Sequence, residues 1–158
     1  MMSASTPLPL RVAIIGAGQV ADKVHASYYA TRSDVQMVAV MDSRLEQAQA
    51  FAERYAIPSA WQDAHEMLQA VKPDVVSVCS PNRFHFGHVM AALEAGCSLL
   101  TEQTLHLNLL DQVVGGLMHV GEAVDLLAGD VGGSSHQILI LRVLSQLVGS
   151  GEGVQGRT

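Results

Sequence analysis

The sequence predicts an α/β domain built on a doubly wound parallel sheet. Short apolar segments typical of buried strands alternate with segments of helical periodicity through the first hundred residues. The first apolar segment ends in a glycine-rich turn that opens into a helix, and the second ends in a carboxylate. With 158 residues, the chain is long enough to bury a core of its own and has the length of one ordinary domain.

The first half of this pattern contains two strands and two helices. Residues 11–15 are continuously apolar and end at a glycine, as expected of a buried strand, and the turn opens a helix over about 19–30. The apolar run at 35–41 is the next expected strand. Residues 44–55 are expected to be helical because their apolar side chains recur at spacings of three and four residues, which places them on one face.

The second half repeats the alternation. Residues 63–71 begin with an aspartate that can cap a helix and end before a Lys-Pro pair that closes it. Residues 74–79 are a clear apolar strand, and the helix expected at 84–95 stops at a glycine. Residues 98–101 are the next expected strand. Because strands joined by helices cross over in the right-handed sense, we expect parallel pairing.

The turn after the first strand reads Gly-Ala-Gly-Gln-Val-Ala and fits the pattern G-x-G-x-x-A. Gly16 permits a tight turn, Gly18 lets a pyrophosphate approach the backbone because it has no Cβ, and Ala21 lets the helix pack closely on the sheet. The free N–H groups of the turn, with Gln19 and Val20 among its residues, and the positive end of the helix dipole can hold phosphates. A tight turn without a ligand is the alternative, but the flanking strand, helix and acid favour a dinucleotide.

Asp42 ends the second expected strand, 26 residues after Gly16. A carboxylate at this place can accept both hydroxyls of the adenosine ribose, which favours NAD and repels the 2′-phosphate of NADP. Capping of the following helix is a second role for Asp42 and is compatible with the first. Ser43 and Arg44 follow as further cofactor-binding candidates, and because an arginine here can meet a 2′-phosphate, NADP stays an open alternative.

A second group of polar residues follows the strand at 74–79. Ser80 and Asn82 are expected at the carboxyl end of that strand, where ligands of open α/β sheets bind, so they can hydrogen-bond the ribose on the nicotinamide side. Together with His85, they form a Ser-Pro-Asn-x-x-His segment, and residues 92–96 read Ala-Leu-Glu-Ala-Gly. These segments resemble the (T/S)-P-N-x-x-H and A-L-x-A-G elements of the glucose–fructose oxidoreductase / inositol dehydrogenase / MocA (Gfo/Idh/MocA) family. The resemblance covers about residues 11–102.

The resemblance implies a Rossmann-like fold, a nicotinamide cofactor, and oxidation or reduction of a sugar or cyclitol hydroxyl. It implies that His85 lines the cofactor site, although a histidine at a helix start also packs or caps. Glu102 matches the first residue of the family's E-K-P segment, and we include it among the cofactor-binding candidates. The family's lysine is Gln103 here and its proline is Thr104. Because glutamine cannot supply the positive charge that stabilises a developing alkoxide, we assign no catalytic residue.

The composition changes near residue 97. All seven aromatic residues, both lysines and all five prolines lie before residue 87, whereas residues 98–158 contain 13 leucines. Members of the family continue into a C-terminal substrate domain, so the resemblance implies a chain truncated or frame-shifted after about residue 97. We expect a flexible N-terminus at 1–10, an NAD(P)-binding domain at 11–104 and a short apolar tail, helical or disordered, at 105–158.

Residues 135–148 are the best helix candidate of the tail, because their apolar side chains form a stripe. Such a stripe can cover a face of the sheet. Left exposed, it can drive self-association or the binding of a partner chain.

Charge and composition exclude several other classes of protein. The 9 Lys+Arg against 15 Asp+Glu give a net charge of −6, which disfavours nucleic acids and anionic membranes as partners. No apolar run approaches the roughly 20 residues that span a bilayer, and the N-terminus lacks the pattern of a secretory signal. The 2 cysteines cannot form a disulfide framework, so we expect a reduced, cytoplasmic setting. His85 and His88 have no third ligand nearby in the sequence, so no metal site is expected.

Taken together, the residues and the resemblance predict an NAD(P)-binding domain that by itself is catalytically incomplete. Its main partner is the dinucleotide, and the apolar tail offers a surface for a second chain. Two alternatives stay open. One is a non-catalytic nucleotide-binding module completed by a partner, and the other is a defective gene product that folds poorly.

Overall fold

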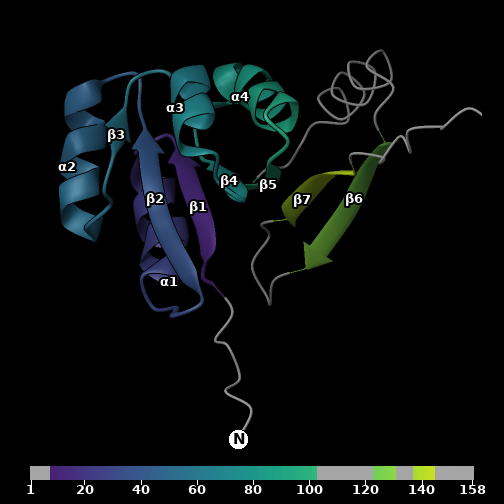
Figure 1. Cartoon of the computed structure of the whole chain (residues 1–158), viewed down its shortest axis with the longest axis horizontal. Helices are drawn as coiled ribbons and strands as arrows, with labels where there is room; N and C mark the ends of the chain where they lie inside the picture. Colours follow the sequence, from purple (N-terminus) through teal and green to yellow (C-terminus); the bar gives the residue numbers. More distant parts are fainter. Residues whose placement is uncertain (1–7, 103–122, 131–136, 145–158) are drawn as a thin grey trace, which may run out of the picture.

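The computed structural model describes residues 8–102 and the segments 123–130 and 137–144. Within these residues the strands form one sheet in the order β3-β2-β1-β4-β5-β7-β6, shown in Figure 1. Five of the strands belong to the first hundred residues and two to the tail. The strands are β1 (Leu10–Ile15), β2 (Val35–Met41), β3 (Ala60–Trp61), β4 (Val75–Val78), β5 (Ser98–Glu102), β6 (Ala123–Asp130) and β7 (Gln137–Leu144).

The first five strands are parallel and doubly wound, as the sequence predicts. β1 lies in the middle and pairs in parallel with both β2 and β4, β2 pairs with β3, and β4 pairs with β5. From the central strand β1, the chain therefore adds β2 and β3 on one side of the sheet and then β4 and β5 on the other. The crevice above the carboxyl ends of β1 and β4 is the switch point at which ligands of such sheets bind.

The helices lie close to their predicted places. Asp63 caps α3 as expected, because its Oδ1 accepts the Glu66 N–H at 2.9 Å, and Gly96 follows α4 with a φ of +73°. The first predicted helix has π-helical geometry in its middle. The helical elements are η1 (Ala21–Ala26), α1 (Ser27–Tyr29), α2 (Leu45–Tyr55), α3 (Ala64–Val71) and α4 (Asn82–Glu94).

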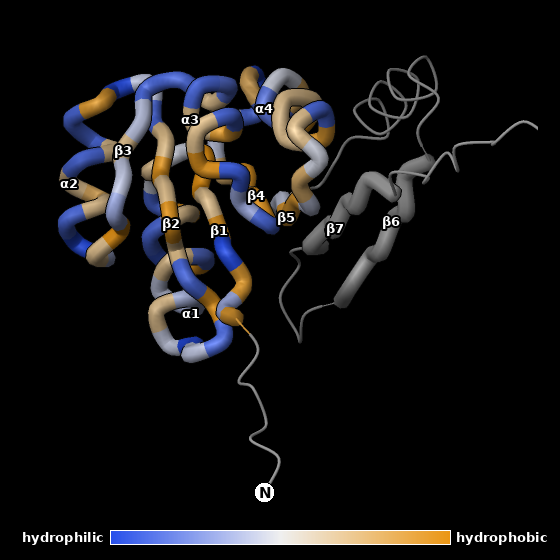
Figure 2. Tube along the Cα trace, in the orientation of Figure 1, coloured by the Kyte–Doolittle hydropathy of each residue, from blue (hydrophilic) through white to orange (hydrophobic). Residues whose placement is uncertain are grey.

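Two apolar cores cover the two faces of the sheet. Side chains of a strand alternate between faces, and β1 shows this directly: Ala13 and Ile15 pack in one cluster with residues of α3 and α4, while Ile14 packs in the other with residues of η1 and α2. Figure 2 shows hydrophobic residues along β1 and β2, whereas hydrophilic and hydrophobic residues alternate along α2. This arrangement holds the carboxyl ends of the strands in a fixed relation to one another.

The strand β3 is missing from the sequence prediction. It is only two residues long and pairs Val40 with Ala60 and Met41 with Trp61. A segment this short has no periodicity of its own, so only its pairing with β2 identifies it as a strand.

The predicted helical tail is wrong for the two described segments of the tail. Residues 123–130 and 137–144 are strands that pair antiparallel with each other, and β7 pairs antiparallel with β5. The spacing of leucines and isoleucines in β7 fits a helix or a strand, but Ile138, Ile140 and Val143 are β-branched, and the open edge of β5 offers backbone partners. The other tail residues, 105–122 and 145–158 among them, lie outside the described part of the chain.

Candidate functional site

The glycine-rich turn joins β1 to the first helix at the centre of the sheet. Gly16 has a φ of +96°, and its N–H donates to the carbonyl of Met41 on β2 at 2.7 Å. A Cβ built at Gly16 would lie 2.8 Å from the backbone nitrogen of Ser80 and 2.9 Å from the carbonyl carbon and oxygen of Cys79. The end of β4 therefore touches the turn, and both the backbone angle and the space require glycine here.

Gly18 stands on the open side of the same turn. A Cβ built there would meet nothing within 4 Å, and the next residues, Gln19 and Val20, are exposed. The helix begins here, since the Asp22 N–H donates to the Gly18 carbonyl at 3.0 Å. The backbone is thus presented to solvent at a helix N-terminus, where N–H groups without helical partners attract anions. This cradle fits the pyrophosphate of a dinucleotide.

Asp42 lies beside the turn, as the sequence predicts. Its Oδ2 accepts the Ala17 N–H at 3.0 Å and its Oδ1 accepts the Arg44 N–H at 3.0 Å. Only 13% of the Asp42 side chain is exposed, and the Arg44 guanidinium lies 3.8 Å from Oδ1. The predicted capping role is met in part: α2 has no side-chain cap, but Asp42 binds the residue that precedes the helix.

Gln47 joins the same network from the first turns of α2. Its Nε2 donates to the Ala17 carbonyl at 2.8 Å, and its Oε1 accepts from the Arg44 guanidinium. Ala17 is therefore held at its N–H by Asp42 and at its carbonyl by Gln47. Gln47 is not predictable from the sequence, since a glutamine inside an amphipathic helix carries no signal of a contact with a turn 30 residues away.

Ser80 lies at the end of β4 and is only 7% exposed. Its hydroxyl forms a hydrogen bond of 2.7 Å with Nδ1 of His88 on α4. His85, one helical turn earlier, is 4% exposed, and its Nδ1 has no hydrogen-bond partner among the described residues. Burial lowers the pKa of His85, against a backbone hydrogen bond with Ser80 that raises it. Asn82 begins α4 and is exposed.

The remaining candidates, Ser43 and Glu102, lie at the carboxyl ends of β2 and β5. Ser43 is exposed, and its carbonyl accepts from the Gln62 amide at 3.0 Å, on the side of the loop after β3. Glu102 ends β5, where its backbone pairs with Ile138. Gln103 and Thr104 lie outside the described residues, so the expected loss of the E-K-P chemistry stays a prediction.

Asp22 joins η1, the helix that follows the turn, to α2 through a hydrogen bond and an ion pair. Its Oδ1 accepts the Tyr55 hydroxyl at 2.6 Å and its Oδ2 lies 2.9 Å from the Arg54 guanidinium. These two partners lower the pKa of Asp22, chiefly through the Tyr55 hydrogen bond, and the same bond raises the pKa of Tyr55. The contact fixes the direction of the helix whose N-terminus forms the cradle.

The Asp22 contact predicts a pH-dependent contribution to stability. A carboxylate whose pKa is lower in the folded than in the unfolded chain stabilises the fold above the unfolded value near 3.8, and this gain is lost as pH falls through the folded pKa. We expect Tyr55→Phe to lower the melting temperature most above about pH 5 and less toward about pH 3. The control is Tyr28→Phe, which removes an exposed hydroxyl that accepts from the Arg32 guanidinium at 3.1 Å and not a hydroxyl bonded to a carboxylate. A gap between Tyr55→Phe and the unmodified protein that stays constant with pH would contradict this role.

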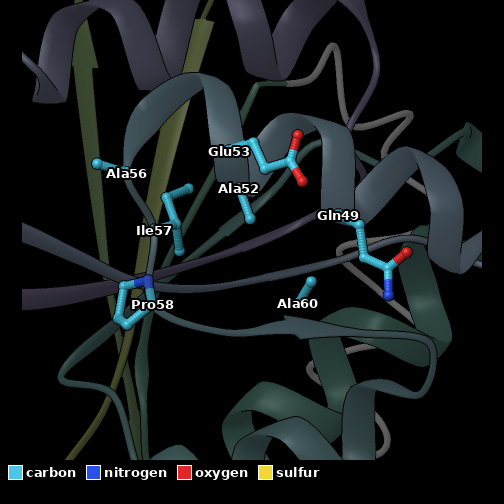
Figure 3. A pocket seen from close by; sticks show the side chains of 7 residues that line it. All are labelled: Gln49, Ala52, Glu53, Ala56, Ile57, Pro58 and Ala60. Carbon is cyan, nitrogen blue, oxygen red and sulfur yellow. The ribbon is translucent and has the colours of Figure 1, made fainter.

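A separate hollow lies at the other end of α2 (Figure 3). Its lining is mostly aliphatic, with the two polar side chains of Gln49 and Glu53 from α2. It shares no residue with the candidates around the turn. Among the described residues, each helix is too short or too polar to span a bilayer.

Comparison with known proteins identifies the family. Residues 10–114 match the Gfo/Idh/MocA family, described as an oxidoreductase family with an NAD-binding Rossmann fold. The chain is 69% identical over 103 residues to the D-glucoside 3-dehydrogenase of Escherichia coli (strain K12), a match that covers 65% of this chain and 29% of that enzyme. It is 29% identical over 102 residues to the myo-inositol 2-dehydrogenase of Thermotoga maritima, covering 65% and 30% of the two chains. The chain thus spans less than a third of the length of these relatives.

Solved structures share the fold. The scyllo-inositol dehydrogenase of Lactobacillus casei with bound NAD(H) and scyllo-inositol superposes with a TM-score of 0.59 at 22% identity, over 70% of this chain and 34% of that one. A 3-ketoreductase from Actinomadura kijaniata with NADP and TDP-benzene gives a TM-score of 0.63 at 23% identity, over 72% and 35%. The motifs around the turn and after β4 are those by which the sequence resembles this family. The chain belongs to the Gfo/Idh/MocA oxidoreductases and contains their Rossmann domain for a nicotinamide dinucleotide.

Proposed function

We propose that this chain binds NAD(H) as the cofactor half of an oxidoreductase that acts on a ring hydroxyl of a sugar or cyclitol. The observation that carries the proposal is the Asp42 carboxylate, whose Oδ2 lies 3.0 Å from the Ala17 nitrogen, inside the glycine turn. The relatives support the substrate class, since one is a dehydrogenase of D-glucosides and the other of myo-inositol. When bound, the nicotinamide supplies the acceptor or donor of a hydride.

We assign the parts of the dinucleotide along the edge of the sheet. The open backbone at Gly18, Gln19 and Val20 faces the pyrophosphate, because N–H groups at a helix start are suited to anions. On one side, Asp42 receives the hydroxyls of the adenosine ribose, with Ser43 next to it. On the other side, the carboxyl end of β4 faces the nicotinamide half. The residues of that half are Ser80, Asn82, His85 and Glu102.

We attribute the binding of the cofactor, rather than turnover, to these residues. Hydride transfer needs a substrate hydroxyl held against the nicotinamide and a group that moves its proton. Gln103 stands where the family has its lysine. Glutamine can donate a hydrogen bond, but it cannot carry a positive charge or transfer a proton.

The surroundings of Asp42 favour NAD over NADP. A carboxylate repels the 2′-phosphate that distinguishes NADP. Arg44 is the one cation that the described contacts place at Asp42, and its side chain is 74% exposed. That guanidinium is engaged by Asp42 and by Gln47. Binding of Arg44 to a 2′-phosphate would therefore break its contacts with Asp42 and Gln47.

Calorimetric titration with NADH and NADPH tests both parts of the proposal. We expect the unmodified protein to bind NADH at least about tenfold more tightly, a difference of about 1.4 kcal/mol. Asp42→Asn removes the charge and leaves one acceptor oxygen for the two backbone N–H groups that Asp42 binds, so it weakens the turn for both dinucleotides. Because the repulsion of the 2′-phosphate is lost, the affinity for NADPH relative to NADH should rise by about tenfold or more. Asp34→Asn, a matched change in an exposed carboxylate that pairs with Arg32 before β2, should leave the ratio unchanged.

The outcomes separate the two parts. If neither dinucleotide binds to the folded protein, the cofactor-binding function is wrong. If both bind and Asp42→Asn leaves their ratio unchanged, the function stands but Asp42 does not select the cofactor.

A further inference from the structure

Ser80 is held by a histidine that the family motifs do not include. We propose that His88 is a positioning residue that orients the Ser80 hydroxyl toward the dinucleotide and makes cofactor binding depend on pH. The inference rests on the proposed function, because it takes Ser80 to face the nicotinamide half of the cofactor. His88 itself need not touch the cofactor.

The position of Ser80 supports this role. Ile15 pairs with Val78 at the carboxyl ends of β1 and β4, and the Cys79 N–H donates to the Ile15 carbonyl at 2.8 Å. The chain then reaches Ser80, whose backbone nitrogen lies 2.8 Å from the place of a Cβ at Gly16. Ser80 is therefore packed against the turn that we assign to the pyrophosphate, at the switch point of the sheet.

The position of His88 is set by its neighbours on α4. Its ring is half-buried and lies 6.1 Å from the Phe84 ring, centroid to centroid, with 36° between the planes. The Arg83 guanidinium in turn lies over the Phe84 ring, with its carbon 4.7 Å from the ring centroid. Beside these rings, Nδ1 of His88 meets the Ser80 hydroxyl at 2.7 Å. A hydroxyl held in this way has a defined direction for its remaining donor or acceptor capacity.

The protonation state of His88 decides whether the Ser80 hydroxyl can accept a hydrogen bond from a ligand or donate one to it. We assign neutral His88 the tautomer in which Nδ1 accepts the Ser80 O–H, so the oxygen of Ser80 keeps lone pairs for a ligand hydroxyl. Protonated His88 carries a hydrogen on Nδ1 and donates to that oxygen instead. The hydroxyl hydrogen of Ser80 must then turn outward, so a ribose hydroxyl can bind Ser80 only by accepting. We assign the ribose hydroxyl the donor role in the complex, and with that assignment the neutral form of His88 favours the bound cofactor.

Burial and the neighbouring histidines favour the neutral form of His88. Burial lowers its pKa from 6.5, and His85 on the same helix and His65 on α3 lower it further, while Asp63 at the start of α3 opposes them. Of the strands packed under α4, β4 contains no ionisable side chain, and β5 contains one, Glu102, at its carboxyl end. The switch in Ser80 is thus expected on the acid side of neutrality.

The test is titration of the full chain with NAD⁺, which is stable in acid, at about pH 7.5 and about pH 5.0. We expect binding by the unmodified protein to weaken threefold to tenfold at the lower pH, about the effect of one hydrogen bond. In His88→Asn the amide oxygen can take the place of Nδ1 without titrating. This variant should bind within about twofold of the unmodified protein at the higher pH and show no weakening at the lower.

Two further variants serve as controls for the role of the bond between Ser80 and His88. Ser80→Ala removes the same hydrogen bond from the other side, so it should bind threefold to tenfold more weakly at the higher pH and lose the pH dependence. His65→Asn removes a neighbouring titratable group but leaves the bond in place, so it should keep the pH dependence of the unmodified protein. Thermal unfolding at both values of pH shows that each variant is folded under the conditions of the titration.

The inference is overturned if NAD⁺ binds equally well, or more tightly, at the lower pH, or if His88→Asn weakens at low pH as the unmodified protein does. Loss of the pH dependence in His65→Asn alone would assign the effect to α3 and also overturn it. Absence of NAD⁺ binding at both values of pH would contradict the proposed function itself, and the role of His88 with it.

Discussion

Replacing Gly16 with alanine is expected to destabilise the protein by about 2–6 kcal/mol, the sum of backbone strain and overpacking. The residue has a φ of +96°, and the new Cβ would lie 2.8–2.9 Å from backbone atoms of Ser80 and Cys79. Backbone atoms at the end of a central strand cannot move aside as a flexible side chain can. Urea unfolding should show a lower midpoint with little change in slope.

The matched control is Gly87→Ala in the interior of α4. A Cβ at Gly87 would meet nothing within 4 Å, and alanine is favoured over glycine in a helix by about 0.5–1 kcal/mol. We therefore expect this variant to be as stable as the unmodified protein or slightly more stable. If Gly16→Ala cost no more than Gly87→Ala, the close approach of β4 to the turn would be wrong.

Replacing Gly18 with alanine is expected to weaken dinucleotide binding about tenfold or more while the fold stays intact. A Cβ here would meet no protein atom within 4 Å, so the folded protein accommodates it. In the proposed complex the pyrophosphate occupies that open space, and a methyl group placed there costs overlap of about 1–3 kcal/mol. Calorimetric titration with NADH measures the affinity, and urea unfolding measures the stability.

The two glycines thus separate stability from binding within a single turn. A variant at Gly18 that binds NADH as tightly as the unmodified protein would contradict the assignment of the turn to the pyrophosphate. A variant at Gly18 that unfolds as easily as Gly16→Ala would show instead that the open side of the turn is packed.

Local patterns predicted most of the fold. The four strands and four helices expected in the first hundred residues all occur, because an apolar run flanked by turn residues has few other stable conformations. The pairing of Asp42 with the glycine turn was also predictable, since the carboxyl ends of parallel strands meet at one edge of the sheet. The tail was not: its leucine and isoleucine spacing suits either a helix or a strand, and the edge of β5 provides the partner that makes β7 a strand.

The site divides in the same way. The sequence predicts the roles of Gly16, Gly18 and Asp42. The two glycines are needed by the backbone of the turn after the first strand, and the carboxylate stands at the end of the second strand, where a ribose binds. The contacts of Gln47 with Ala17 and of His88 with Ser80 do not, since they join a helix to a loop from another element. Helical periodicity places a side chain on a face, but what that face touches depends on how the helix packs on the sheet. Only the packed chain brings these side chains to the edge where the dinucleotide is proposed to lie.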